Sequence, residues 1–151
     1  MSEKFYHYIE CGLSNIYLIN GYKIIETNQG KAVSFNDIDG LHKAIGMSLV
    51  SSKKDFSGNE VRFLRHEMLM SQDTLAHLLG ISEQSIRRWE NDKINIPKPS
   101  ELLLRLLYRE KINNQHGKVS KILKELANLE DQISDKKMLF EDTFVGWKVS
   151  A

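Results

Sequence analysis

The spacing of apolar residues predicts different structures along the chain. Near the N-terminus, β-branched and aromatic residues gather in short runs between turn signals, which is typical of strands. The predicted strands are Tyr6–Glu10, Ile16–Ile19, Tyr22–Thr27 and Lys31–Phe35. Asn20-Gly21 predicts a tight hairpin between the second and third strands, and Asn28-Gln29-Gly30 predicts a further turn. A small β-containing unit is therefore expected first.

Helical spacing replaces this pattern further along the chain. A first helix is expected from Asn36 or Asp37, either of which can cap it, to about Leu49, and the polar stretch Ser51–Gly58 predicts a linker. Four more helices are expected at Glu60–Leu69, Gln72–Leu79, Glu83–Asn91 and Pro99–Lys111. Proline suits a first helical turn, so Pro97 and Pro99 favour the start of the last of these.

The C-terminal part combines an apolar helical stripe with an apolar tail. The stripe consists of Val119, Ile122, Leu123, Leu126, Leu129 and Ile133. It fits packing within the chain and dimerisation equally well, and Asp142–Val149 predicts a final strand. The expected fold class is α+β, with a β-containing unit over residues 1–50, an all-helical domain over 59–111, and a long helix and tail over 117–151.

Composition excludes several classes of function. The chain has 151 residues, 21 basic and 20 acidic, and no apolar run long enough to cross a bilayer. With one cysteine, Cys11, and no secretory signal core at the N-terminus, we expect a cytoplasmic protein without disulfides. The five histidines are scattered, and no nucleophile set or phosphate-cradling loop is present. We therefore expect no metal, no cofactor and no enzymatic activity.

The most informative segment runs from Ser71 to Glu90. Ser71 and Ser82 can each cap a helix, and Gly80 between them can end the first helix with a positive φ. Two helices joined by such a tight turn form a helix-turn-helix. An ordinary helical hairpin is the plainer alternative.

The second helix of this segment has two different faces. Ile86 and Trp89 share one face, which we expect to be buried, while Gln84 and Arg88 lie four apart on the opposite face. Amide and guanidinium groups there suit base edges in the major groove of double-stranded DNA. Arg87, Asn91, Ser85 and Glu83 lie beside them, and Gln72, Lys93 and Lys98 are candidates for phosphate contacts. A solvated face with internal ion pairs is the alternative for the two arginines.

This segment resembles the phage repressor and Cro class of helix-turn-helix proteins, the XRE family. The matching residues are Gln72, Leu75-Ala76, Gly80-Ile81-Ser82, Gln84-Ser85-Ile86 and Trp89-Glu90-Asn91. The resemblance implies a compact five-helix, usually dimeric domain whose positions matching Gln72, Glu83, Gln84, Ser85 and Arg88 contact DNA. Glu83 departs from the family, in which a neutral or basic residue is commoner at this position.

The whole layout is more loosely similar to MqsA-type antitoxins and related regulators, which join a β-containing unit to an XRE-like domain. Those proteins hold zinc through paired Cys-x-x-Cys motifs, whereas this chain has only Cys11. The similarity implies a toxin or effector protein as a possible partner of the N-terminal strands. A dimerisation or purely structural sheet is an equal alternative for them.

The acidic residues near the motif suggest an alternative to DNA binding. Residues 60–111 hold nine basic and eight acidic residues, and Asp73, Glu83, Glu90 and Asp92 lie in or beside the motif. We therefore expect modest non-specific affinity and a homodimer on two half-sites about one helical turn apart. The rival is a protein-binding module that keeps the fold without binding DNA.

Overall fold

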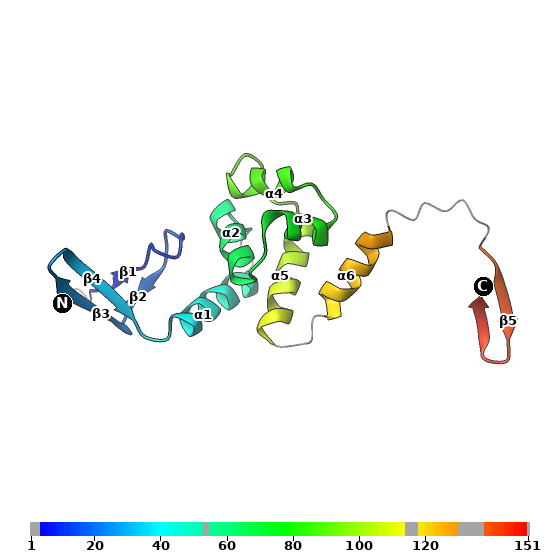
Figure 1. Ribbon diagram of the computed structural model, residues 1–151, viewed down its shortest axis with the longest axis horizontal. Helices are drawn as coiled ribbons and strands as arrows, with labels where there is room; N and C mark the ends of the chain where they lie inside the picture. The colour runs from blue at the N-terminus through cyan, green and yellow to red at the C-terminus, as the bar shows by residue number, and fades with distance from the viewer. Residues whose placement is uncertain (1–3, 53–54, 114–117, 130–137, 151) are drawn as a thin grey trace.

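The computed structural model describes residues 4–52, 55–113, 118–129 and 138–150, in which a group of helices lies between small antiparallel sheets (Figure 1). The elements are β1 (Tyr6–His7), β2 (Tyr17–Leu18), β3 (Tyr22–Thr27), β4 (Gly30–Phe35), α1 (Ile38–Ser51), α2 (Gly58–Glu67), α3 (Gln72–Leu79), α4 (Glu83–Glu90), α5 (Lys98–Ile112), α6 (Lys118–Asn128), β5 (Phe140–Thr143) and β6 (Gly146–Val149). The α+β fold class is confirmed. None of the described helices combines the length and the apolar character needed to cross a bilayer.

The N-terminal strands pair differently from the sequence prediction. β1 pairs with β2, and β3 pairs with β4 across the two-residue turn Asn28–Gln29. The hairpin predicted at Asn20-Gly21 is therefore wrong, and Gly21, with a φ of 83°, instead joins two separate sheets. Packing explains the outcome, because the Tyr6 ring on β1 lies 5.0 Å from Tyr22 and 5.7 Å from Phe35, between ring centroids.

The predicted linker connects α1, which ends at Ser51, to α2, which begins at Gly58, and hydrogen bonds hold its last residues. Ser57 caps α2 by accepting a hydrogen bond from the backbone N–H of Glu60, whose carboxylate accepts from the Ser57 N–H in return. This is a capping box, which satisfies two helix-end donors at once. Phe56 is buried, and its N–H donates to the Glu101 carboxylate at 2.8 Å. The prediction of a segment connecting two helices is therefore confirmed, whereas the burial of Phe56 against a partner 45 positions away was not expected.

Arg105 of α5 donates hydrogen bonds to the C-terminal end of α1. One of its guanidinium nitrogens, Nη1, lies 3.0 Å from the carbonyl oxygens of Leu49 and Val50 and 2.6 Å from that of Ser52. The same guanidinium lies over the Phe56 ring, 4.2 Å from its centroid. Carbonyl groups at the end of a helix lack partners within the helix, and the guanidinium binds these three in addition to the Ser52 N–H and hydroxyl that donate to Leu49.

The core of the molecule lies among the helices. Its most deeply buried side chains come from α2, α3, α4 and α5 and include Leu64, Leu75, Ile86, Leu104 and Tyr108. Each helix therefore contributes an apolar face to one shared interior. That interior fixes α3 and α4 relative to each other and to α2.

The C-terminal part differs from the prediction in its tail. α6 begins where the Glu110 carboxylate accepts the backbone N–H of Val119 at 2.7 Å, and it packs against α3 and α5. The predicted stripe includes Ile133, which lies outside the described residues. The single strand predicted over Asp142–Val149 is wrong, because β5 and β6 form a hairpin with Gly146 at a φ of 111°.

Candidate nucleic-acid interface

Local caps set the ends of the two helices of the motif. The Ser71 hydroxyl accepts the Thr74 N–H at 3.0 Å, and the Ser82 hydroxyl accepts the Ser85 N–H at 3.2 Å. Gly80 ends α3 in the left-handed conformation, with a φ of 68°. Because each cap comes from the predicted residue, the helix-turn-helix geometry is confirmed.

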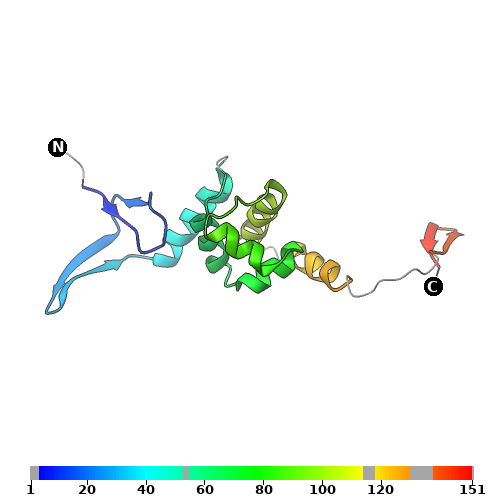
Figure 2. The same cartoon turned by 90° about the horizontal axis from the view of Figure 1, so that it is seen from above.

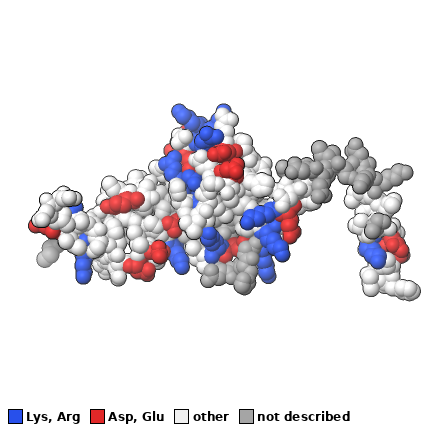
Figure 3. All heavy atoms as spheres, viewed as in Figure 1, with Lys and Arg blue, Asp and Glu red and all other residues white. Residues whose placement is uncertain are grey.

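The two faces of α4 have opposite character. Ile86 and Trp89 are buried against the core, while Gln84, Arg87 and Arg88 are exposed and Ser85 is half-buried. Figure 3 shows basic side chains gathered at the top of the molecule, over α4. The helix therefore carries hydrogen-bond donors toward solvent and is held from behind by apolar packing.

A buried carboxylate holds the end of α4 in place. The side chain of Glu90 is fully buried and accepts hydrogen bonds from Arg65 of α2, at 2.7 Å from Nε and 2.9 Å from Nη2. Arg62 Nε lies at 3.3 Å and Gln72 Nε2 at 3.2 Å from the same group. Burial raises the pKa of Glu90, but the hydrogen bonds from Arg65 and Gln72 outweigh it and bring the pKa below its ordinary value.

This cluster was missed from the sequence. The available signal was an acid directly after the buried Trp89, with two arginines three residues apart on a predicted helix. Sequence spacing does not show that Glu90 and Arg65 meet, because 25 positions separate them.

The sequence of this region also matches a known protein family. Residues 61–104 match the Helix-turn-helix family model. The matched range begins within α2 and ends within α5, so it contains all of α3 and α4. It supports a DNA-binding regulator in general, a class that is not typically enzymatic. No curated protein and no solved structure matches the chain, and the MqsA-type layout is not confirmed.

The other candidate DNA contacts lie around the helix-turn-helix in different settings. Gln72 is half-buried and donates to Glu90, and the Asn91 side chain accepts from Arg62 Nη2 at 3.4 Å. Lys93 is exposed just after α4, and Glu83 is exposed in its first turn. Glu83, Asn91 and Lys93 therefore lie in α4 or directly after it, and Gln72 lies at the start of α3.

Lys98 stands apart from this group. Its ammonium group lies 2.7 Å from the Glu101 carboxylate and 3.6 Å from Asp55. The hydrogen bond to Glu101 raises the pKa of Lys98. Lys98 thus takes part in the contacts that join α5 to the segment before α2.

Two of the four acids near the helix-turn-helix have partners within the protein. Glu90 is neutralised by arginines, and the Asp92 carboxylate accepts the Gly58 N–H at 2.9 Å. Asp73 and Glu83 remain exposed, each in the first turn of its helix. The positive end of the helix dipole lies there and stabilises a negative charge. The acidic residues therefore oppose DNA less than their number in the sequence indicates.

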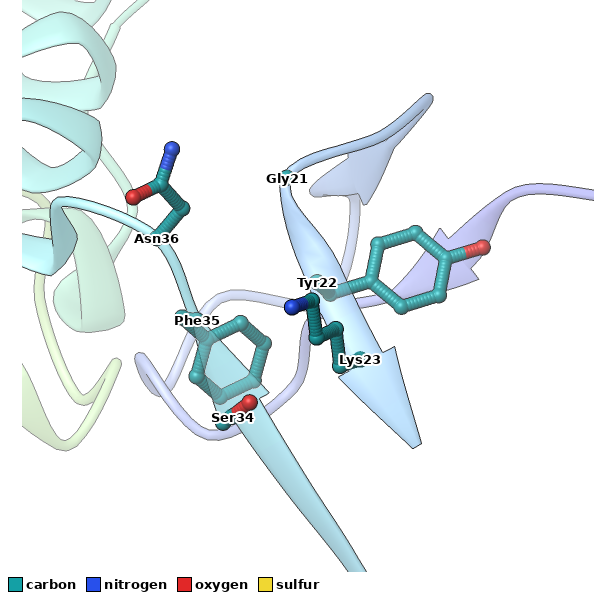
Figure 4. Close-up of a pocket in the computed structure, with 6 residues that line it drawn as sticks. All are labelled: Gly21, Tyr22, Lys23, Ser34, Phe35 and Asn36. Atoms are coloured by element: carbon teal, nitrogen blue, oxygen red, sulfur yellow. The ribbon is translucent and has the colours of Figure 1, made fainter. Parts of the chain in front are cut away.

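Two further sites lie in or beside the N-terminal unit. The Tyr8 hydroxyl and His42 Nε2 are 2.7 Å apart, and His42 Nδ1 lies 2.6 Å from the Glu67 carboxylate, so a polar chain joins this unit to α1 and α2. A groove of about 500 Å³ lies at the base of the β3–β4 hairpin. Figure 4 shows the residues that line it, among them Lys23 and Phe35. The described residues include no group of three side chains suited to hold a metal ion.

Proposed function

We propose that the protein is a transcriptional regulator that binds specific sequences of double-stranded DNA as a homodimer. Gln84, Ser85 and Arg88 would read base edges in the major groove. Phosphate contacts would come from Arg87, Lys93 and Gln72 and, at the edge of the surface, from Lys98. Glu83 and Asn91 would lie beside the residues that read bases.

One observation carries the proposal. The outer face of α4 keeps an amide and two guanidinium groups free for a duplex, while Ile86 and Trp89 lock its inner face. Because this helix is already ordered, it can enter the major groove without the entropy loss of folding on binding. One such helix reads few base pairs, which is why the proposal includes two copies.

A binding titration with the DNA upstream of the protein's own gene tests the function. We expect specific binding that weakens steeply between low and moderate salt, because phosphate contacts release counterions. A scrambled duplex of the same length is the matched control. Equal binding to both duplexes would contradict base reading, and no binding to either would favour the protein-binding alternative.

The narrower form of the proposal is an antitoxin role. Its support is the loose similarity of layout, with the N-terminal strands as the surface for a toxin. Co-expression with the product of the adjacent gene, followed by purification of the full chain, tests it. A stable complex that also inhibits that product supports the antitoxin role, and independent elution contradicts it.

A further inference from the structure

α6 carries two apolar lines, and only one of them is covered. Val119 and Leu123 pack against the core beside α3 and α5. Ile122 and Leu126 of α6, with Leu129 directly after its last residue, form a second line, each with 54–55 % of its surface exposed. Three large aliphatic side chains at spacings of four and three make a continuous stripe on a helix. We call these three residues the α6 stripe.

The C-terminal hairpin has an apolar face of its own. Phe140 pairs with Val149 and Asp142 pairs with Trp147, so these four residues share one face. Glu141 and Lys148 lie opposite each other on the other face. Trp147 is 73 % exposed and Phe140 is 55 % exposed. An isolated two-stranded hairpin is at best marginally stable in water, so this face needs a cover.

The two surfaces agree in size and charge. The α6 stripe is about 10 Å long at 1.5 Å per helical residue, and a four-residue strand is about 13 Å long. Lys118 lies in line with the stripe, four residues before Ile122, and Asp142 lies on the apolar face of the hairpin. α6 has three lysines against one glutamate, whereas β5 and β6 have two acids against one lysine. Attraction between unlike charges therefore favours α6 with the hairpin over α6 with a second α6.

We propose that two copies of the chain exchange their C-terminal hairpins, so that the hairpin of each copy covers the α6 stripe of the other. Both views show the hairpin standing away from the helices of its own chain (Figures 1 and 2). Reciprocal exchange obeys two-fold symmetry and covers both stripes and both hairpin faces, so none of these four surfaces stays open. Because α6 is fixed to α3 and α5, the exchange would also set the distance between two α4 helices.

The first test measures association of the full chain without DNA, so its result does not depend on whether the chain binds DNA. Light scattering at tens of micromolar should give twice the chain mass of 17.4 kDa. Leu126→Asp and Trp147→Asp should each weaken dimerisation at least tenfold, because each places a charge in an apolar contact. Leu69→Asp is the matched control, since Leu69 is 88 % exposed elsewhere in the molecule, and it should leave the dimer intact.

A mixing experiment then separates exchange from other dimers. A Leu126→Asp chain and a Trp147→Asp chain together retain one intact contact, between the α6 stripe of the second and the hairpin of the first. Energy transfer between differently labelled chains should therefore appear in the mixture at concentrations where neither variant dimerises alone. Circular dichroism of each variant confirms that its helices are kept.

Four results would overturn the proposal. A wild-type monomer would mean that the hairpin covers its own chain or nothing. Loss of the dimer with Leu126→Asp alone would indicate a contact between two α6 helices. Loss with Trp147→Asp alone would indicate a contact between two hairpins. Two defective variants that fail to restore each other in the mixture would also exclude exchange.

Discussion

The carboxylate of Glu90, at the end of α4, is paired in a bidentate manner with the guanidinium of Arg65 in α2, with nitrogen–oxygen distances of 2.7 and 2.9 Å. Both side chains are buried, so the pair joins two helices inside the protein rather than at its surface. The position of the proposed reading helix therefore depends on an ion pair that itself has no access to DNA.

Removing one partner of this pair should be strongly destabilising. We expect Arg65→Met to lower the free energy of unfolding by about 3–5 kcal/mol, because it leaves a buried charge without its main partner. Urea denaturation followed by circular dichroism measures the change. The double variant Arg65→Met with Glu90→Leu should recover much of the loss, since it removes both charges. Equal stability of the single and double variants would contradict this account.

Acid should weaken the same contact. The pKa of Glu90 lies below its ordinary value of 4.5 in the folded protein. A carboxyl with a lowered folded pKa stabilises the fold above its unfolded pKa, and this contribution is lost as the pH falls through the folded value. The free energy of unfolding should therefore decline below about pH 4.5.

The variant Glu90→Gln should show a shallower decline, although Glu101, whose pKa is also lowered, keeps part of the slope. Denaturation curves across the acid range give the comparison. Glu26→Gln in the exposed β3 strand is the control and should follow the wild type. A Glu90→Gln slope identical to that of the wild type would exclude Glu90 as a source of acid sensitivity.

Arg88 should matter for DNA rather than for the fold. We expect Arg88→Ala to cost about 1–3 kcal/mol of binding free energy and to relax specificity at one base position. Thermal unfolding should remain close to that of the wild type, because the side chain is exposed. Titrations with the specific duplex and its single-base variants measure both effects. Lys23→Ala in β3 removes an exposed positive charge far from α4 and should leave the specificity unchanged. Full affinity and selectivity in Arg88→Ala would refute its assignment to base reading.

Tyr108 offers a stabilising substitution. Its hydroxyl is buried with no hydrogen-bond partner among the described residues, and burial raises its pKa to about 12. Tyr108→Phe should raise the free energy of unfolding by about 1 kcal/mol, because it removes an unsatisfied polar group without changing the ring. Chemical denaturation measures the gain. A loss of more than about 1 kcal/mol would reveal a hydrogen bond to the hydroxyl.

Gly46 should tolerate no side chain at the same contact. A Cβ atom on Gly46 would lie 1.9 Å from the Tyr108 hydroxyl oxygen and 2.2 Å from Cζ of the ring. We expect Gly46→Ala to lower the free energy of unfolding by at least about 1–3 kcal/mol through overpacking between α1 and α5. Adding Tyr108→Phe should relieve only part of this loss, since the ring carbon remains. A fully stable Gly46→Ala protein would show that α1 and α5 can separate freely.

The helix-turn-helix could be predicted because its determinants are local. Ser71, Gly80 and Ser82 act within four residues of their partners, so each contact lies within one short segment of the sequence. The buried and exposed faces of α4 follow from the helical repeat alone. The same locality explains the correct turn at Asn28–Gln29.

The remaining features depend on distant contacts. Asn20-Gly21 has the residues of a hairpin turn, but β3 pairs with β4 instead, while Tyr6 of β1 packs on Tyr22. The sequence around Ser51–Gly58 is polar and does not indicate that the Phe56 N–H donates a hydrogen bond to Glu101, 45 positions away. Spacing within one segment cannot show such a partner, because it depends on the course of the whole chain.

Arg105 also decides where the protein can be divided for engineering. One side chain of α5 binds the last carbonyl groups of α1 and stacks on Phe56, so the described residues on both sides of the connection between α1 and α2 are held by α5. A chimera joined within that stretch would keep the arginine and lose the groups it binds. A seam at Asn36–Asp37 keeps α1 attached to the helices that hold it, provided that the exchanged unit supplies a side chain in place of the buried Tyr8, which pairs with His42.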